Sequence, residues 1–302
     1  MSFRIRVPAT TANLGPGFDC LGLALDLWNE VEAAVSGSDL KIEIDGVGRG
    51  LLPVDHKNAI YRAMEHYAER HRKELPSGVS LSCMNRIPLG SGMGSSAAAA
   101  VAGILAAAVI LDIPRDIEDQ LACAAQIEGH PDNAAPCLLG GLVASSLDNG
   151  KVIAHRLPIS DFYFVIVHPF FTFPTHAARA ALPKQVPHGD AVTNAGHVLL
   201  LSEALRSGDV ELLAFAMQDR LHEPYRLPLI PGASSAIAAA KSAGAITVVL
   251  SGAGPSLLAF SPSPKQNQEI ALAMQAAFTI VNLKSEVFYP SIAQTGAEIS
   301  PG

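Results

Sequence analysis

The sequence predicts an α+β protein with two domains, and three observations lead to this prediction. The chain has 302 residues, which is long enough for two hydrophobic cores. In the first half, a glycine-rich loop at 90–94 leads directly into an alanine-rich helix. In the second half, strand and helix patterns follow in the order β-α-β-β-α-β once inserted helices are set aside, which is the ferredoxin-like pattern. A turn signal at 148–150 marks the end of the first half, and we divide the chain into 1–155 and 156–302.

Hydrophobic periodicity and cap residues define the elements of the first half. They are a strand over 3–7, a turn-rich loop over 8–17, strands over 21–35, a helix over 58–70, a half-exposed strand over 79–84, the alanine-rich helix after residue 94, a helix over 114–127 and a strand over 140–145. We expect Asp55 and Asp112 to cap the helices at 58–70 and 114–127, and Ser95 and Ser96 to cap the alanine-rich helix.

The second half alternates more plainly between strands and helices. The expected strands are 163–168, 245–250, 257–260 and 279–289, and the expected helices are 175–182, 193–206, 209–221, 233–243 and 264–277. Pro264 stands at the first position of the last helix, where the missing N–H of proline costs no hydrogen bond.

Composition excludes several function classes. The net charge is −7 and no cluster of Lys or Arg occurs, which argues against nucleic acid and against an anionic membrane surface as partners. The longest apolar run, 97–111, is too short to span a bilayer, and the first residues lack the apolar core of a secretion signal. Four cysteines show no C-x-x-C pairing. We therefore expect reduced thiols and a cytoplasmic protein.

The glycine-rich loop at 90–94 indicates a phosphate site. Gly90, Gly92 and Gly94 let the backbone turn tightly and approach a ligand closely. The first N–H groups of the following helix have no partner within the helix and lie at the positive end of its dipole, where an anion binds well. The loop lacks the Gly-Lys-Ser/Thr ending of a P-loop, and it fits the dinucleotide pattern only in part. A buried core helix with a glycine-rich entry remains the alternative.

Two further segments gather polar side chains beside glycine or proline. Asn13 and Asp19 lie in a Gly/Pro-rich loop that can present an amide and a carboxylate to a small polar ligand, or that simply forms a turn. The segment 128–133 combines carboxylates and a carboxamide at a helix end, which suits a magnesium ion shared with phosphates. A capped helix terminus is the alternative explanation for this second segment.

Two arginines stand out because the chain contains only 16% charged residues. Arg179 and Arg226 are candidates to bind a carboxylate, since a guanidinium pairs with a carboxylate through two parallel hydrogen bonds. Ordinary surface ion pairs are the alternative for each of them. The glycine loop at 251–256 either brings backbone close to a ligand or merely connects two strands of a hairpin.

Considered together, these segments resemble the GHMP small-molecule kinases, in the form that phosphorylates L-homoserine. Residues 8–22, 88–98 and 251–256 resemble the first, second and third motifs of that family, in the same order. Residues 128–133 and 223–226 are similar to stretches that distinguish the kinases of L-homoserine from their relatives. The resemblance is spread over nearly the whole chain.

The resemblance implies a fold, an activity and partners. The fold is an N-terminal ATP-binding domain of the ribosomal-protein-S5-domain-2-like type over 1–155 and a ferredoxin-like C-terminal domain over 156–302. The activity is transfer of phosphate from ATP, with Mg²⁺, to the hydroxyl of L-homoserine on the route to threonine. On the charge given above we expect no nucleic-acid or membrane partner, and a homodimer stays open.

The resemblance also assigns roles to individual residues. The residues implied to hold ATP are Asn58, Pro88, Gly90, Ser91, Gly92, Met93, Gly94, Ser95 and Ser96, and those implied to hold magnesium are Ser96 and Glu128. The residues implied to bind the substrate are Asn13, Asp19, His130, Arg179, Arg226 and Gly252. The residues implied to act in catalysis are Asn133, Thr175 and Arg179. Asn133 stands where several relatives carry a catalytic aspartate, which leaves the existence of a general base open.

Three alternatives stay open at this point. A GHMP kinase for a sugar or a mevalonate-like alcohol is disfavoured by Asp19 and the two arginines, which suit an amino acid. A non-catalytic binding protein on the same fold is disfavoured by Ser96 and Glu128, because a sensor needs no magnesium ligands. A dinucleotide-binding oxidoreductase is disfavoured because the strand before Gly90 alternates instead of being continuously apolar.

Overall fold

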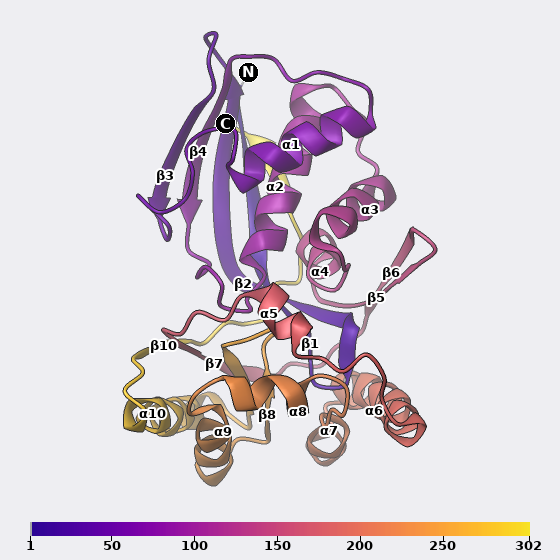
Figure 1. The fold of residues 1–302 in the computed structure, drawn as a ribbon, viewed down its shortest axis with the longest axis vertical. Coiled ribbons are helices and arrows are strands. Elements are labelled where there is room, and N and C mark those ends of the chain that lie inside the picture. Colours follow the sequence, from indigo (N-terminus) through magenta and orange to yellow (C-terminus); the bar gives the residue numbers. More distant parts are fainter. Residues whose placement is uncertain (1) are drawn as a thin grey trace.

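The structure is a computed structural model that describes residues 2–302, and these residues form two β-sheets with their helices (Figure 1). The first sheet has seven strands, in the order β11-β1-β2-β4-β3, with β5 pairing to β2 and to β6. Its strands are β1 Ser2–Asn13, β2 Gly17–Val35, β3 Lys41–Gly46, β4 Val79–Asn85, β5 Leu142–Asp148, β6 Lys151–Leu157 and β11 Glu298–Pro301. The helices of this half are α1 Ala59–Arg70, α2 Ser95–Ile110, α3 Ile117–Glu128 and α4 Ala134–Leu139. In Figure 1, α1, α2 and α3 lie on one side of this sheet.

The second sheet has four antiparallel strands in the order β10-β7-β9-β8. Its strands are β7 Tyr163–Pro169, β8 Thr247–Leu250, β9 Leu257–Ser261 and β10 Ser285–Phe288. The helices of this half are α5 Thr175–Ala180, α6 His188–Ser207, α7 Val210–Ala216, α8 Glu223–Arg226, α9 Ala233–Ser242 and α10 Pro264–Ile280. The order of strands and of the helices α9 and α10 confirms the predicted ferredoxin-like pattern. Among residues 2–302, no helix is long and apolar enough to cross a membrane.

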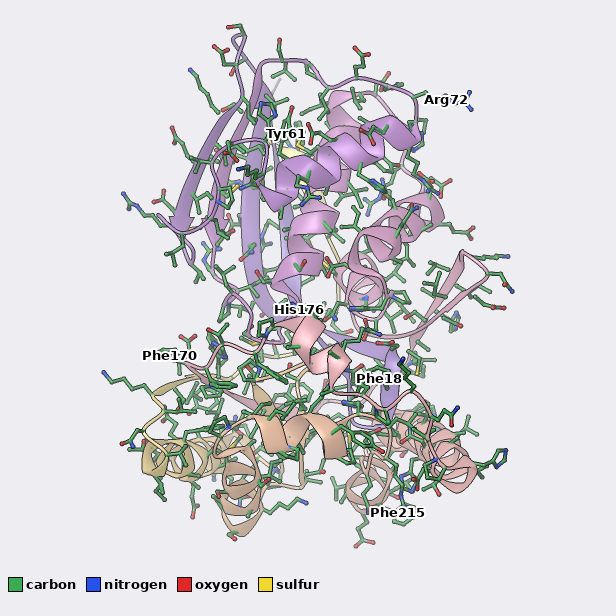
Figure 2. All side chains as sticks on the ribbon, viewed as in Figure 1. Phe18, Tyr61, Arg72, Phe170, His176 and Phe215 are labelled. Carbon is green, nitrogen blue, oxygen red and sulfur yellow. The ribbon has the colours of Figure 1, made fainter. Side chains whose placement is uncertain are left out.

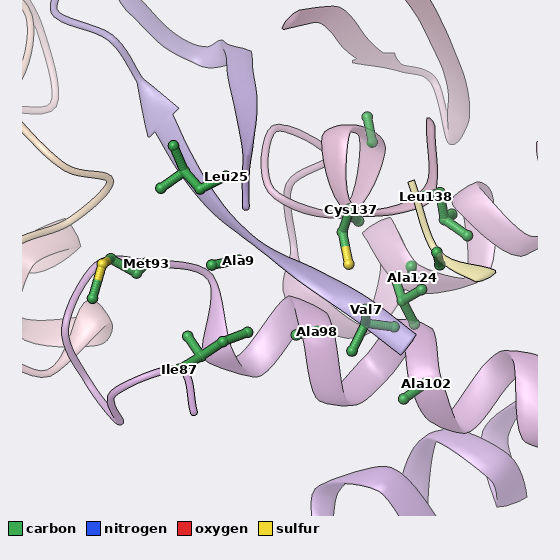
Figure 3. Close-up of a cluster of buried hydrophobic side chains, with 14 of the residues drawn as sticks. Val7, Ala9, Leu25, Ile87, Met93, Ala98, Ala102, Ala124, Cys137 and Leu138 are labelled. Carbon is green, nitrogen blue, oxygen red and sulfur yellow. The ribbon is translucent and has the colours of Figure 1, made fainter. Parts of the chain in front are cut away.

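Helix α2 lies in the centre of the first core. It is apolar on all sides, as a helix that is buried all round must be, and its residues from Ala97 to Ala108 are almost all buried. Figure 3 shows Ala98 and Ala102 of this helix beside Val7 of β1. Alanine side chains are short, so strand and helix backbones pack closely around α2. The apolar run in the sequence is therefore a core helix.

Gly103 shows how close this packing is. A Cβ atom added to Gly103 would lie 2.2 Å from the carbonyl oxygen of Ile60 in α1. Side chains cannot relieve that contact, because the neighbouring atom belongs to the backbone. The absence of a side chain at this position is therefore what lets α1 and α2 cross.

Gly103→Ala is expected to destabilise the protein by about 1–3 kcal/mol, because overpacking at this crossing outweighs the better helix propensity of alanine. The matched control is Gly196→Ala in α6, where the added Cβ meets nothing within 4 Å. That control should be neutral or stabilising by up to about 1 kcal/mol. Urea unfolding of both variants measures the two effects, and an unchanged midpoint for Gly103→Ala would contradict the packing account.

The caps of the first three helices differ from the sequence prediction. The N-cap of α1 is Asn58, whose Oδ1 accepts from the N–H of Ile60, whereas Asp55 accepts from Lys57 one turn earlier. The N-cap of α3 is Asp116 instead of Asp112. Both predictions were wrong because several Asp and Asn residues precede each helix and periodicity does not choose between them. Helix α2 is preceded by Gly94, and neither serine caps it.

Some boundaries also differ. The predicted loop over 8–17 is wrong for residues 8–13, which continue β1 opposite β2 with two register shifts. Helix α7 ends at Ala216, several residues before its predicted end at 221. Helix α10 extends to Ile280, so the last strand of the second sheet begins at Ser285 and not at 279.

Three strands were not predicted: β3, β6 and β11. Their pattern is weak because they are short, polar or half-exposed. Strand β11 follows the second sheet in the chain but pairs with β1 of the first sheet, so both chain ends lie at the same end of the molecule in Figure 1. The division at 155/156 stays a prediction. The first sheet's β6 ends at residue 157 and the second sheet's β7 begins at 163.

Candidate active site

The three motifs that lie far apart in the sequence meet in space. The Oγ of Ser251 donates to the carbonyl oxygen of Gly92 at 2.8 Å, and the N–H of Gly252 donates to the carbonyl oxygen of Ala12 at 3.1 Å. The Nδ2 of Asn13 donates to the carbonyl oxygen of Gly252 at 2.8 Å. A Cβ on Gly92 would lie 2.2 Å from the Ser251 carbonyl oxygen. These contacts fix the three loops relative to one another.

The turn between β1 and β2 carries backbone strain. Asn13, Leu14 and Asp19 all have positive φ, at 72°, 48° and 57°. Side-chain-bearing residues adopt this region at a cost and tend to do so where a site requires it. The turn is held from the second half of the chain, because Asn194 of α6 donates to the carbonyl oxygen of Pro16 at 2.7 Å. Asn13 and Asp19 are thereby presented on a fixed frame.

The loop before α2 has the geometry of an anion site. Gly90, Gly92 and Gly94, which we expected to let the backbone turn tightly, all have positive φ. Gly94 precedes α2 without any side-chain cap, so the N–H groups of the first turn are left for another acceptor. The hydroxyl of Ser96 does not cap the helix, because its Oγ donates to Oε1 of Glu128 at 2.7 Å. The helix end and a hydroxyl–carboxylate pair therefore stand side by side.

Two adjoining clefts open at this helix end. The first is polar, and its lining residues are Asn13, Asp19, Gly90, Ser91, Gly92, Gly94, Ser95, Ser96, Glu128, His130, Asp132, Asn133, Thr175, Arg179, Arg226, Gly252, Ala253 and Gly254. The second is mostly apolar, includes Val7, Val31, Ile44, Leu52 and Asn58, and shares Gly90, Ser95 and Ser96 with the first. A ligand with an apolar ring at one end and phosphates at the other fits this pair of clefts.

The two candidate arginines both reach the polar cleft. Arg179 of α5 makes a two-pronged ion pair with Asp19, with both N···O distances 2.9 Å. Arg226 of α8 is only 2% exposed, and its Nε donates to the carbonyl oxygen of Ala178 at 3.2 Å. Within residues 2–302, no carboxylate lies within ion-pairing distance (4.0 Å) of Arg226. Burial and the nearby charge of Arg179 lower the pKa of Arg226. A buried guanidinium without a carboxylate indicates an anionic ligand.

The carboxylates at the end of α3 complete the cleft. Burial raises the pKa of Glu128, although the hydrogen bond from Ser96 partly opposes this shift. Burial lowers the pKa of His130, but the hydrogen bond and charge of Asp132 outweigh burial, so the net shift is upward. Asn133 accepts from the hydroxyl of Thr10 at 2.8 Å. A cation placed beside Glu128 would relieve the cost of burying its charge.

The structure brings most of the predicted site residues together, with three qualifications. Asn58 lines the apolar cleft, but its amide is engaged at both ends, with Ile60 N–H and the Pro53 carbonyl. Pro88 lines neither cleft. Met93 lines neither cleft and is 1% exposed, and Figure 3 shows its side chain in a cluster of buried hydrophobic residues. The structure therefore offers no support for a contact between the side chains of Pro88 or Met93 and a ligand in either cleft.

Sequence reasoning did not single out two residues that shape the site, Phe18 and His222. Each stands next to a residue that was singled out, so proximity in the sequence was an available signal. Their importance depends on contacts across the two halves of the chain, which single-sequence patterns do not reveal.

Comparison with known proteins agrees with this geometry. The family model described as GHMP kinases N terminal domain matches residues 58–141, and the one described as GHMP kinases C terminal matches residues 201–280. The chain belongs to the GHMP kinase family. The predicted α+β fold of two GHMP domains is thereby confirmed.

Curated relatives narrow the resemblance within this family. A homoserine kinase from Moorella thermoacetica is 44% identical over 285 residues, which cover 94% of this chain and 95% of that protein. One from Carboxydothermus hydrogenoformans is 40% identical over 293 residues, covering 97% of this chain and 95% of that protein. The crystal structure of homoserine kinase from Cytophaga hutchinsonii superposes with a TM-score of 0.86 at 35% identity, over 99% of this chain and 97% of that one.

Proposed function

We propose that this GHMP kinase transfers the γ-phosphoryl group of ATP to the hydroxyl of L-homoserine, producing O-phospho-L-homoserine for threonine biosynthesis. The single observation that carries the proposal is the buried Arg226 without a carboxylate partner, in the same cleft as the glycine loop. Relatives named homoserine kinase over nearly the whole chain support the choice of substrate.

The amino-acid end of the substrate fits the charged end of the cleft. The carboxylate of L-homoserine would bind Arg226 and Arg179, and its ammonium group would bind Asp19, with His130 and Asn13 beside them. Asp19 and Arg179 form an ion pair in the structure. When the substrate binds, its ammonium group would replace Arg179 as the partner of Asp19, and its carboxylate would replace Asp19 as the partner of Arg179. Because the substrate carries one charge of each sign, its binding leaves the net charge of the cleft unchanged.

The phosphate end fits the start of α2. The free N–H groups after Gly94, with the loop 90–94, would hold the phosphates of ATP, and the apolar cleft would take its base. The oxygen atoms of Ser96 and Glu128 suit Mg²⁺, which prefers hard oxygen ligands. When bound there, Mg²⁺ would neutralise charge that develops on the phosphates.

Positioning explains catalysis here better than a strong base does. Phosphoryl transfer passes through a loose transition state, so orientation and charge stabilisation dominate over proton abstraction. Asn133 is a neutral amide already fixed by Thr10, and with Thr175 it would orient the substrate hydroxyl toward the γ-phosphorus. Arg179 would add positive charge nearby. The hydroxyl proton would then pass late to a phosphate oxygen.

The cysteines bear on the place of this enzyme in the cell. All four cysteines are free thiols, and burial raises the pKa of Cys20 and Cys123 to about 11, which fits reduced, unreactive residues. We propose a cytoplasmic enzyme on this basis. Formation of a homodimer is a prediction that sedimentation of the purified protein would decide.

A coupled assay of ADP release tests the proposed function. L-homoserine should give the highest kcat/KM when it is compared with L-serine, L-threonine, mevalonate and galactose. L-serine lacks one methylene and would place its hydroxyl short of the γ-phosphorus, so it serves as the matched control. Clear turnover of mevalonate or galactose, together with none of L-homoserine, would reject the substrate assignment while leaving the kinase fold intact.

A further inference from the structure

Phe18 lies at the centre of the charged end of the cleft, although it carries no polar group. It is the second residue of β2, next to Asp19, and Figure 2 shows it at the junction between the two halves of the molecule, near α5. Its ring centroid lies 5.1 Å from Cζ of Arg226 and 5.7 Å from Cζ of Arg179. The imidazole of His222 stacks on the same ring, with 5.2 Å between the ring centroids and an angle of 26° between the ring planes. One aromatic ring therefore contacts both candidate carboxylate-binding arginines.

The arginines have few other fixed contacts. Among the described residues Arg226 makes two hydrogen bonds, from Nε to the carbonyl oxygen of Ala178 at 3.2 Å and from a terminal nitrogen to Nδ1 of His222 at 3.4 Å. His222 is fully buried, and its Nε2 donates to the carbonyl oxygen of Gly15 at 2.8 Å, so Nδ1 is left to accept from Arg226. Burial lowers the pKa of His222, which keeps it in this neutral, accepting form.

Arg179 depends on Phe18 in a different way. In the described structure Asp19 holds Arg179 through two hydrogen bonds. If the ammonium group of a substrate engages Asp19, as the proposed function requires, Arg179 loses part of that hold. The ring of Phe18 then attracts its guanidinium together with the charge of Asp132, because the face of an aromatic ring attracts a cation.

We propose that Phe18 is a specificity-determining residue, which holds Arg179 and Arg226 in position and so gives this site its preference for substrates that carry a carboxylate. The inference rests on the proposed function. An aliphatic side chain of similar size would fill the same space but would not attract the two guanidiniums. The repulsion between the two like charges would then be offset less, since the ion pair of Asp19 with Arg179 would remain but the attraction of the ring would be lost.

The test measures how binding depends on the carboxylate alone. L-2-aminobutyrate has the ammonium and carboxylate of L-homoserine but no hydroxyl, and 1-aminopropane is the same molecule without the carboxylate. Inhibition constants of both are measured against L-homoserine phosphorylation, for the wild type, Phe18→Leu, Phe18→Met and Phe18→Tyr. Phe215→Leu is the control, because Phe215 is an exposed aromatic residue (53%) on α7, away from the arginines.

Phe18→Leu is expected to raise the inhibition constant of L-2-aminobutyrate and the KM for L-homoserine about tenfold, equivalent to about 1.4 kcal/mol. The inhibition constant of 1-aminopropane and the KM for ATP should stay within about twofold. Phe18→Tyr should restore the preference, and Phe215→Leu should leave it unchanged. Phe18→Met gives the same answer if the leucine variant does not fold, since methionine fills the space without an aromatic face.

Equal weakening of both inhibitors, or weakening of neither, would overturn the inference and leave Phe18 as a packing residue. A merely structural role would lower the melting temperature and weaken both inhibitors alike. Failure of the proposed function has a separate signature, because it would appear as absence of L-homoserine turnover by the wild-type protein.

Discussion

Arg226→Leu is expected to weaken L-homoserine binding by about 2–5 kcal/mol while ATP binding stays nearly unchanged. Loss of a charge-assisted contact to a desolvated carboxylate has this magnitude. Arg226 is 2% exposed and has no carboxylate partner within the described chain, so the substrate would meet a guanidinium already stripped of water. Calorimetry with L-homoserine and with a non-hydrolysable ATP analogue measures the two affinities separately.

Three further variants test whether the loss of affinity comes from the guanidinium group itself. Arg226→Lys should recover only part of the affinity, because an ammonium group lacks the planar fork of a guanidinium. Arg179→Leu should also weaken L-homoserine more than ATP, and by less than Arg226→Leu because Arg179 is more exposed. Arg206→Leu, at an exposed arginine that pairs with Glu203, should change neither affinity. Normal L-homoserine affinity in both leucine variants at 226 and 179 would show that these arginines are not the carboxylate site.

Glu128→Gln is expected to lower kcat sharply and to raise the Mg²⁺ concentration needed for half-maximal rate. The substitution keeps the size of the side chain and removes the charge proposed to hold the metal ion. Stabilisation of phosphate charge by a metal ion contributes several kcal/mol to the transition state. Ser96→Ala should have the same effect in weaker form, because its hydroxyl is a neutral ligand.

Melting temperature distinguishes this role from a structural one. Burial raises the pKa of Glu128, so replacing its carboxyl by an amide should leave the stability near that of the wild type or slightly above it. The control Glu118→Gln changes an exposed carboxylate at the other end of α3 and should leave the Mg²⁺ dependence unaffected. If Glu128→Gln retains the Mg²⁺ dependence of the wild type, Glu128 does not belong to the metal site.

Local patterns predicted much of the fold. Helix α2 and strands β7, β8 and β9 of the second sheet have a strong apolar signal, since nearly all of their residues are buried. Strand β11 could not be predicted in this way, because Glu298 pairs with Arg6 across 292 residues and its short segment has little apolar character. Caps were missed where several acidic or amide residues compete for one helix start.

The glycines and the charged side chains of the candidate site were predictable from the sequence. Gly92 and Gly94, Asp19, Glu128 and Arg226 could be recognised because glycine, carboxylate and guanidinium groups suit phosphate, metal ion and amino acid. Phe18 and His222 could not, since an aromatic residue beside a turn is typical of an ordinary core. Their significance arises from β2 and α8 meeting in space, which single-sequence patterns do not show.

The most direct test of the account is ³¹P NMR of a reaction mixture of the protein with L-homoserine, ATP and Mg²⁺. The account predicts a new phosphomonoester signal that grows in step with ADP as the γ-phosphate signal of ATP disappears, and no such signal when L-homoserine is omitted. Formation of ADP and inorganic phosphate without a phosphomonoester, or no loss of ATP at all, would contradict it.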